Sequence, residues 1–239
     1  MHHRGVKRIA GCLFAAVVLL SVGSQAQQPD AAAIIHDLDA ANQARFDNVL
    51  GFTDVEHYVV FRGSDQIKPA AEMTVKMTYK RGVGKDYVVV SQSGSSLIQK
   101  VGLRPLLENE KTINHPATVA QSWFTSANYE MHLKPGVTQT IDGRPCLAIS
   151  ISPRHKAPNM IDGTLWVDAA THTLVEVEGV ASKSPSIFAG TTKMMRRYVN
   201  MGGYSMAVHA RAESTSTLFG RTVIVIDYSD YHFQLRAAK

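Results

Sequence analysis

The spacing of apolar residues changes from a helical period to alternation soon after residue 48. Between Asp30 and about Asn48, apolar residues recur every three or four positions, which predicts a helix that the Asp30 side chain caps. The following segments alternate between apolar and polar residues and predict strands at 57–62, 72–80 and 87–91. In the second of these strands, one face carries large apolar side chains, which are Met73, Val75, Met77 and Tyr79.

A helical pattern returns between residues 95 and 128, and strand patterns follow it to the end of the chain. One helix is expected over 97–107, with an interruption at Pro105, and Pro116 is expected to open a second helix that runs through Phe124. The order of one helix, about three strands, two helices and about six strands is typical of an α+β fold. We therefore expect one large antiparallel sheet that is covered by helices on one side.

The first 26 residues have the pattern of a secretory signal peptide. Basic residues within the first eight positions precede an apolar run over 9–20, and the small residues of Ser24-Gln25-Ala26 form a cleavage site. The apolar run is too short to span a bilayer comfortably. These features predict export to the periplasm, cleavage after Ala26 and a single mature domain over 27–239 without a transmembrane segment.

Removing this segment changes the charge and the cysteine content of the chain. Arg4, Lys7 and Arg8 leave with it, so the formal net charge falls from +5 to +2, and a nucleic-acid partner is not indicated. Cys12 lies in a lipobox-like context, but the apolar run follows this cysteine instead of preceding it, which argues against lipidation. Cys146 is then the only cysteine, so no intramolecular disulfide is expected. A hydrophobic content of 45% excludes a disordered chain.

Two candidate catalytic motifs are weak. Gly203-Tyr204-Ser205-Met206-Ala207 resembles a nucleophile elbow that lacks its last glycine, but an alternating strand follows Ser205 where the elbow needs a helix. A hairpin turn is the better interpretation, and a secreted serine hydrolase that uses Ser205 stays a weaker alternative. Asp168 and His172 lie in a tight turn between two predicted strands, so a structural role is expected for them. We therefore predict no catalytic residue.

Metal and cofactor sites are not predicted either. The mature chain holds eight histidines, but none stands in an H-x-H or H-x-x-x-H arrangement, and Cys146 has no thiol partner.

Methionines are frequent in or near the strands, and their flexible side chains suit a surface that accepts apolar ligands of variable shape. Ile187 and Phe188 fall in an apparent loop, which makes them candidates for contact with a partner, and packing of the loop back onto the core is the competing interpretation.

The arrangement resembles the LolA-like superfamily, which comprises the periplasmic outer-membrane lipoprotein carrier and its relatives. The resemblance lies in the order of elements, in the strand pair that ends Tyr79-Lys80-Arg81-Gly82 and continues Asp86–Ser91, and in a W-x-D hairpin at Gly163–Asp168. It covers most of residues 30–233. This resemblance implies a curved, incomplete antiparallel barrel whose concave apolar face is closed by helices and holds acyl chains.

The sequence thus predicts a non-enzymatic envelope protein that binds lipid or lipoprotein acyl chains as a carrier or chaperone. An envelope protein is a further candidate partner, and a sensor of the same fold that binds a regulatory partner is the alternative. The candidate pocket residues on strands are Met73, Val75, Met77, Tyr79, Leu147, Ile149, Ile151, Leu165, Val167, Met206 and Val208. The candidate lid residues are Leu103, Leu106, Leu107, Trp123 and Phe124.

Overall fold

The computed structural model describes residues 30–157, 159–183, 190–216 and 220–237. The predicted first helix is confirmed as α1 (Ala31–Asn48). Its Asp30 cap is also confirmed, because one carboxylate oxygen accepts hydrogen bonds from the amides of Ala32 at 2.9 Å and Ala33 at 3.4 Å. The helix therefore begins where its capping residue requires.

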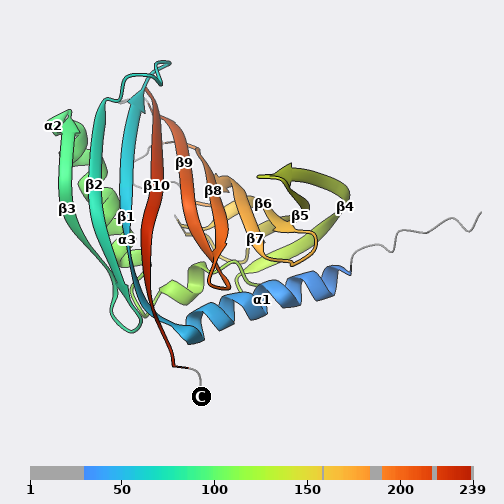
Figure 1. Cartoon of the computed structure of the whole chain (residues 1–239). Coiled ribbons are helices and arrows are strands. Elements are labelled where there is room, and N and C mark those ends of the chain that lie inside the picture. Colours follow the sequence, from blue (N-terminus) through green and yellow to red (C-terminus); the bar gives the residue numbers. More distant parts are fainter. Residues whose placement is uncertain (1–29, 158, 184–189, 217–219, 238–239) are drawn as a thin grey trace, which may run out of the picture.

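Ten antiparallel strands form one sheet that does not close into a barrel (Figure 1). Its spatial order is β3-β2-β1-β10-β9-β8-β7-β6-β5-β4, so the first and last strands of the chain lie side by side inside the sheet. The strands are β1 (Val49–Arg62), β2 (Ala71–Lys80), β3 (Gly84–Gly94), β4 (Tyr129–Ile141), β5 (Arg144–Pro153), β6 (Ile161–Asp168), β7 (Leu174–Ala181), β8 (Thr192–Met201), β9 (Tyr204–Ser216) and β10 (Gly220–Leu235).

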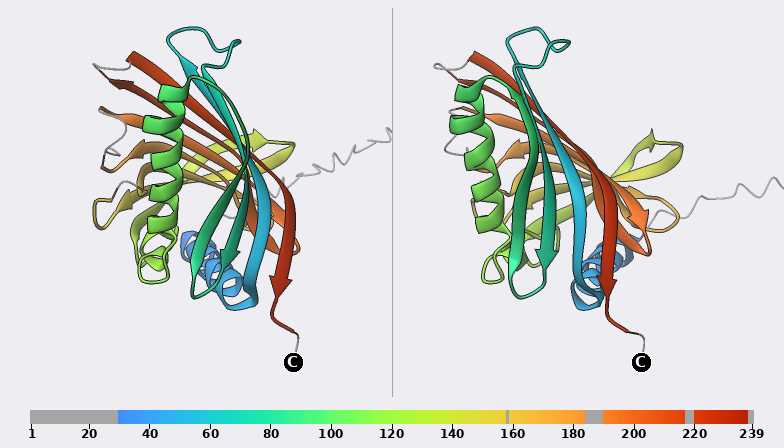
Figure 2. Two further views of the ribbon diagram at one scale, coloured as in Figure 1. Left: turned by 90° about the vertical axis from the view of Figure 1, so that its left-hand side faces the viewer. Right: turned by 60° about the vertical axis from the view of Figure 1, so that its left-hand side comes forward.

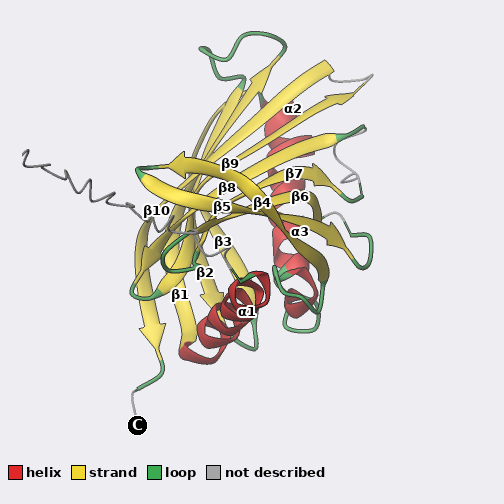
Figure 3. Ribbon diagram, turned by 90° about the vertical axis from the view of Figure 1, so that its right-hand side faces the viewer, coloured by secondary structure: helices red, strands yellow, loops and turns green. Residues whose placement is uncertain are grey.

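Helices cover the concave side of this curved sheet, as the α+β prediction required (Figure 2). The helical run of α2 (Ser96–Ile98), a π-helical turn (Gln99–Leu103) and α3 (Arg104–Ile113) crosses the half of the sheet that contains β1, β2 and β3. Helix α1 packs against the other half, where Ile34 and Leu38 join a buried cluster with residues of β4 to β8 (Figure 3). The two helical segments thus leave a space between them on the concave face.

The expected interruption at Pro105 is wrong, because the helical run continues through this residue. The amide of Arg104 bonds to the carbonyl of Gln99, five residues back, and this π-helical turn ends just before Pro105. Pro105 is the second residue of α3 and supplies no amide hydrogen to the helix. A wider turn therefore accommodates the proline without breaking the helix.

The second helix that was expected from Pro116 through Phe124 is also wrong. Only a short 3₁₀ helix forms, at Val119–Ser122, and Trp123 is already extended. The side chain of Asn128 donates hydrogen bonds to the carbonyls of Ala120 at 2.8 Å and Trp123 at 2.9 Å. These bonds satisfy backbone groups that a longer helix would have paired internally.

Candidate ligand cavity

A cavity of about 320 Å³ lies on the concave face between α1, α3 and the sheet. Side chains from β1, β2, β8, β9 and β10 form one wall, and side chains of α1, α3 and the segment around Val119–Phe124 form the other. Six of the predicted pocket and lid residues line this cavity, and they are Met77, Tyr79, Leu106, Trp123, Phe124 and Met206. Ligand binding by these six residues stays a prediction.

The other predicted pocket and lid residues lie outside the cavity lining. On one half of the sheet, Leu147, Ile149, Ile151, Leu165 and Val167 pack in or against the core beneath α1. On the other half, Met73, Val75, Leu103 and Leu107 are buried where the π-helical turn and α3 contact β1 and β2. These nine side chains build the walls behind the cavity and hold its helices in place.

Val208 occupies a β-bulge and is not part of the cavity lining. Arg197 pairs with His209 and Tyr198 pairs with Ala207, so Val208 has no partner on β8. Ala207 and Ala210, on either side of the bulge, line the cavity. Strict alternation from Met206 predicted an inward side chain at 208, and the extra residue of the bulge breaks that alternation.

One part of the cavity wall is aromatic. The rings of Phe46 and Trp123 join α1 to the segment after the 3₁₀ helix, with centroids 4.9 Å apart. On the sheet, the ring of Phe52 lies 5.3 Å from that of Tyr79 and 5.8 Å from that of Tyr231. These flat, largely apolar side chains offer a surface along which an aliphatic chain can pack.

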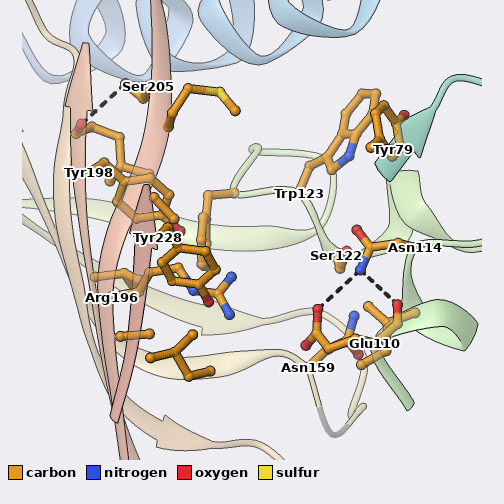
Figure 4. A pocket seen from close by; sticks show the side chains of 18 of the residues that line it. Tyr79, Glu110, Asn114, Ser122, Trp123, Asn159, Arg196, Tyr198, Ser205 and Tyr228 are labelled. Carbon is orange, nitrogen blue, oxygen red and sulfur yellow. Dashed lines mark hydrogen bonds between the residues drawn. The ribbon is translucent and has the colours of Figure 1, made fainter. Parts of the chain in front are cut away.

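A charged cluster lies in the same cavity. The amine of Lys85 on β3 lies 3.3 Å from a carboxylate oxygen of Glu110 on α3 and 3.9 Å from one of Glu56 on β1. Burial alone would lower the pKa of Lys85, but the carboxylates of Glu110 and Glu56 more than offset this effect and hold the pKa above its ordinary value. The amide of Asn114 also donates to Glu110, as Figure 4 shows.

Two carboxyl groups on β1 are almost completely buried in this cluster. Asp54 is 3% exposed and Glu56 is 1% exposed. Burial raises the pKa of Asp54 to about 7, and the neighbouring charge of Glu56 adds to the rise. Burial also raises the pKa of Glu56, although Tyr58 donates a hydrogen bond to it. One oxygen of each carboxyl group has no hydrogen-bond partner among the described residues.

Sequence reasoning missed these carboxyl groups, although the alternation of β1 contains the signal. Phe52, Asp54, Glu56, Tyr58 and Val60 occupy every second position and are all buried on one face. Because side chains at every second position share one face of a strand, the two acidic residues lie on the same face as the large apolar ones. This placement is unusual, because aspartate and glutamate are seldom buried. Polar residues on the apolar face of a strand therefore mark this part of the cavity.

The side chains considered for catalysis have structural contacts. Ser205 lines the cavity, and its hydroxyl donates to the carbonyl of Leu174 at 3.2 Å. The glycines before it have φ values of 62° and 93° and form the predicted hairpin turn between β8 and β9. The Asp168 carboxylate accepts backbone amides of its own turn, whereas His172 contacts Asp37 of α1 at 2.8 Å.

Several further predictions concern metal, membrane and partner sites. Within the described ranges, no group of histidine, cysteine, aspartate and glutamate side chains could hold a metal ion. The helices described in the structure include none that is long and apolar enough to cross a membrane. Cys146 is buried among apolar residues. The signal peptide with Cys12, and the candidate partner residues Ile187 and Phe188, lie outside the described residues.

Comparison with solved structures supports the expected fold. A putative outer-membrane lipoprotein-sorting protein domain from Vibrio parahaemolyticus aligns with a TM-score of 0.51 and 11% identity, over 88% of this chain and 96% of that one. A DUF1329 family protein from Desulfovibrio piger aligns with a TM-score of 0.49 and 14% identity, over 87% and 95% of the two chains. A LolA superfamily protein from Nitrosomonas europaea gives 0.47 and 14%, over 88% and 96%.

The predicted resemblance to the LolA-like superfamily is thus confirmed at the level of the fold. At 11% identity, the likeness to the Vibrio parahaemolyticus domain concerns the fold alone and says nothing about the residues of a site. No family model matches this chain, and no curated protein matches it in sequence.

Proposed function

We propose that this chain is an exported, non-enzymatic protein of the bacterial envelope that binds an acyl chain of a lipid or lipoprotein. The observation that carries this proposal is the cavity of about 320 Å³ between the curved sheet and its helices. Its volume falls at the lower end of the roughly 300–1,000 Å³ that is typical of small-molecule sites. An acyl chain is an apolar molecule that a cavity of this volume can hold.

The lining supports an aliphatic ligand. Met77 and Met206 are flexible and polarisable, and the rings of Phe46, Phe52 and Trp123 extend the apolar surface. Each buried methylene contributes about 0.8 kcal/mol, so ten of them contribute about 8 kcal/mol before the cost of immobilising the chain. The shared fold with a putative lipoprotein-sorting domain agrees with such a ligand, and the signal-peptide pattern agrees with an envelope location.

Filling the cavity tests this function directly. Ala210 lines the cavity, so Ala210→Phe places a large ring where the acyl chain would lie. Val208 lies two residues earlier on the same strand but outside the lining, so Val208→Phe is the matched control. Displacement of a fluorescent fatty acid should show at least a tenfold loss of affinity for Ala210→Phe and less than a twofold change for Val208→Phe. The proposal is wrong if the wild-type protein takes up no fatty acid and native mass spectrometry finds no bound lipid.

A further inference from the structure

Two arginine side chains line the cavity and form no ion pair with a carboxylate in the described part of the chain. Arg45 extends from α1 and Arg196 from β8, and both are partly buried. Figure 4 shows Arg196 extending from its strand into the pocket beside Tyr228. Guanidinium groups remain charged at every physiological pH. A cavity suited to an aliphatic chain thus also holds two unpaired positive charges.

Among the described residues, two neighbouring arginines of the sheet have carboxylate partners, unlike Arg45 and Arg196. Arg197 follows Arg196 on β8, and its guanidinium pairs with Glu176 at 2.9 Å and with Asp142 at 3.4 Å. Arg211 also lines the cavity, but it pairs with Glu213 at 3.3 Å and binds Gln66 at 3.0 Å. Adjacent strand residues point to opposite faces, so Arg197 has a carboxylate partner outside and Arg196 has none inside.

The acidic groups of the cavity do not balance these charges. Glu110 is already paired with Lys85. Burial alone would lower the pKa of Arg196, but Tyr228, Tyr198 and the charge of Glu110 hold it above its ordinary value, so Glu110 acts on Arg196 without forming an ion pair with it. Asp54 and Glu56 are buried carboxyl groups whose pKa values burial raises, so they lose charge more readily than exposed acids. Burial also lowers the pKa of Arg45, which is the effect expected for a cation that lacks a close counter-ion. The cavity therefore has an excess of positive charge.

Neutral donors surround the same two side chains. The rings of Tyr79, Tyr198 and Tyr231 lie within electrostatic range of Arg45, and those of Tyr198 and Tyr228 lie near Arg196. All four tyrosines line the cavity, although the hydroxyl of Tyr231 already donates to the carbonyl of Ala207 at 2.7 Å. Guanidinium and phenol groups are both hydrogen-bond donors, and guanidinium binds carboxylate or phosphate oxygens through two parallel bonds. This combination is suited to a small anionic group.

We propose that the cavity binds an anionic amphiphile, with a carboxylate or phosphate group held by Arg45 and Arg196 and the aliphatic chain packed on the apolar lining. The inference rests on the proposed function, because it names the chemical class of the molecule that the cavity holds. Burying a cation without a partner is costly, and an anionic ligand would remove that cost when it binds. The two arginines would thus select ligands by charge, while the apolar lining supplies the affinity for the chain.

Ligands that share one chain length separate charge from hydrophobicity. Dodecanoate and dodecanol would each displace N-phenyl-1-naphthylamine, a neutral fluorescent probe, from the full-length mature protein. The wild-type protein should prefer dodecanoate at least tenfold at low salt, and the preference should fall as the salt concentration rises. Arg196→Gln and Arg45→Gln should each reduce this preference to about threefold or less, because they weaken the binding of dodecanoate much more than that of dodecanol.

Two control variants keep the test informative. Arg197→Gln removes the neighbouring guanidinium outside the cavity and should retain the full preference for dodecanoate. Arg196→Lys keeps the positive charge and should retain most of it, which separates loss of charge from loss of fold. Inorganic phosphate alone should not displace the probe at millimolar concentration, because it has no chain to bury.

Three other outcomes would contradict either the proposed charge selection, the proposed amphiphilic ligand or the proposed function. Equal affinity of the wild-type protein for dodecanoate and dodecanol would overturn the charge selection and leave the acyl-chain function standing. If inorganic phosphate displaced the probe as strongly as dodecanoate, the arginines would bind a free anion, and the proposal of an amphiphilic ligand would be wrong. If neither the probe nor either ligand binds, the proposed function itself fails.

Discussion

The amine of Lys85 on β3 and the carboxylate of Glu110 on α3 lie 3.3 Å apart and join the helix to the edge of the sheet from inside the cavity. A second ion pair joins α3 and β3 on the surface, where the amine of Lys111 lies 3.2 Å from Asp86. In this pair the lysine is on the helix and the carboxylate is on the strand. The side chain of Lys85 is 16% exposed and its amine also faces Glu56, whereas the side chain of Lys111 is 33% exposed and that of Asp86 is 76% exposed. Both lysines therefore form an ion pair between α3 and β3, but that of Lys85 is largely buried and that of Lys111 is more exposed to solvent.

Replacement of the inner lysine should destabilise the fold much more than replacement of the outer one. Lys85→Met leaves Glu110 and Glu56 without their buried cation, which typically costs about 3–5 kcal/mol. Lys111→Met removes only exposed pairs, each worth less than about 1 kcal/mol. Urea unfolding would measure both free energies of unfolding. Equal losses in the two variants would show that the inner cluster is as well solvated as the surface.

Asp54 should make the stability of the wild-type protein decrease with rising pH. Its pKa is about 7 in the folded chain, against an ordinary value of 3.8, so between these values the native state holds a proton that the unfolded state has lost. The stabilisation by neutral Asp54 is complete below about pH 4 and is lost as the pH rises through 7.

Asp54→Asn keeps the shape and removes the titration. The free energy of unfolding of this variant should match that of the wild type near pH 4 and exceed it by up to about 4 kcal/mol above pH 8, since each pH unit corresponds to about 1.4 kcal/mol. Asp65→Asn is the control of opposite sign, because backbone amides of Ile67 and Lys68 hold the pKa of exposed Asp65 below its ordinary value. A pH-independent difference between Asp54→Asn and the wild type would place the pKa of Asp54 in its usual range.

Periodicity predicted most elements of the fold and missed those whose pattern is irregular. Strand β2 alternates cleanly and was found, whereas the four residues of β4 between Leu133 and Thr138 lie opposite a single residue of β5, so the pairing shifts there. In β8, the adjacent residues Arg196 and Arg197 are both charged, so apolar and polar residues do not alternate there. Arg196 lines the cavity, whereas Arg197 pairs with Glu176. Each of these strands pairs with its neighbours along the chain, but the local spacing of apolar residues does not reveal either one.

The cavity was predicted less completely than the sheet. Apolar composition identified Met77 and Met206, which line it, together with Ile149 and Leu165, which are equally apolar but belong to solid core. Sequence alone gives the face of a strand, whereas the position of the helices decides which part of that face stays uncovered. The charged lining, including Arg196, was missed because apolar residues alone were sought there.

Gly163 allows β6 and β7 to approach closely, and its replacement should separate them. A Cβ atom at this position would lie 2.0 Å from the carbonyl oxygen of Glu178 and 2.6 Å from the Cα of Gly179, so backbone would have to move. Gly163→Ala should lower the free energy of unfolding by about 2 kcal/mol or more. Gly143→Ala is the control, because its φ of 76° adds strain but no atom lies within 4 Å of the new Cβ. A smaller loss for Gly163→Ala than for Gly143→Ala would contradict this close approach.

Ligand binding should be visible in the fluorescence of Trp123 and invisible in that of Trp166, the only other tryptophan of the chain. Trp123 lines the cavity, whereas Trp166 is buried in a separate cluster with Cys146 and Val175. An aliphatic chain in the cavity replaces water beside the indole of Trp123, so its emission should shift to shorter wavelength.

Single-tryptophan variants assign this signal, and titration with dodecanoate gives its size. Trp166→Phe should retain the shift, and Trp123→Phe should abolish it while still binding the chain, because phenylalanine preserves part of the aromatic contact with Phe46. A shift that persists in Trp123→Phe and disappears in Trp166→Phe would place the bound chain on the other side of the sheet, outside the space between α1 and α3.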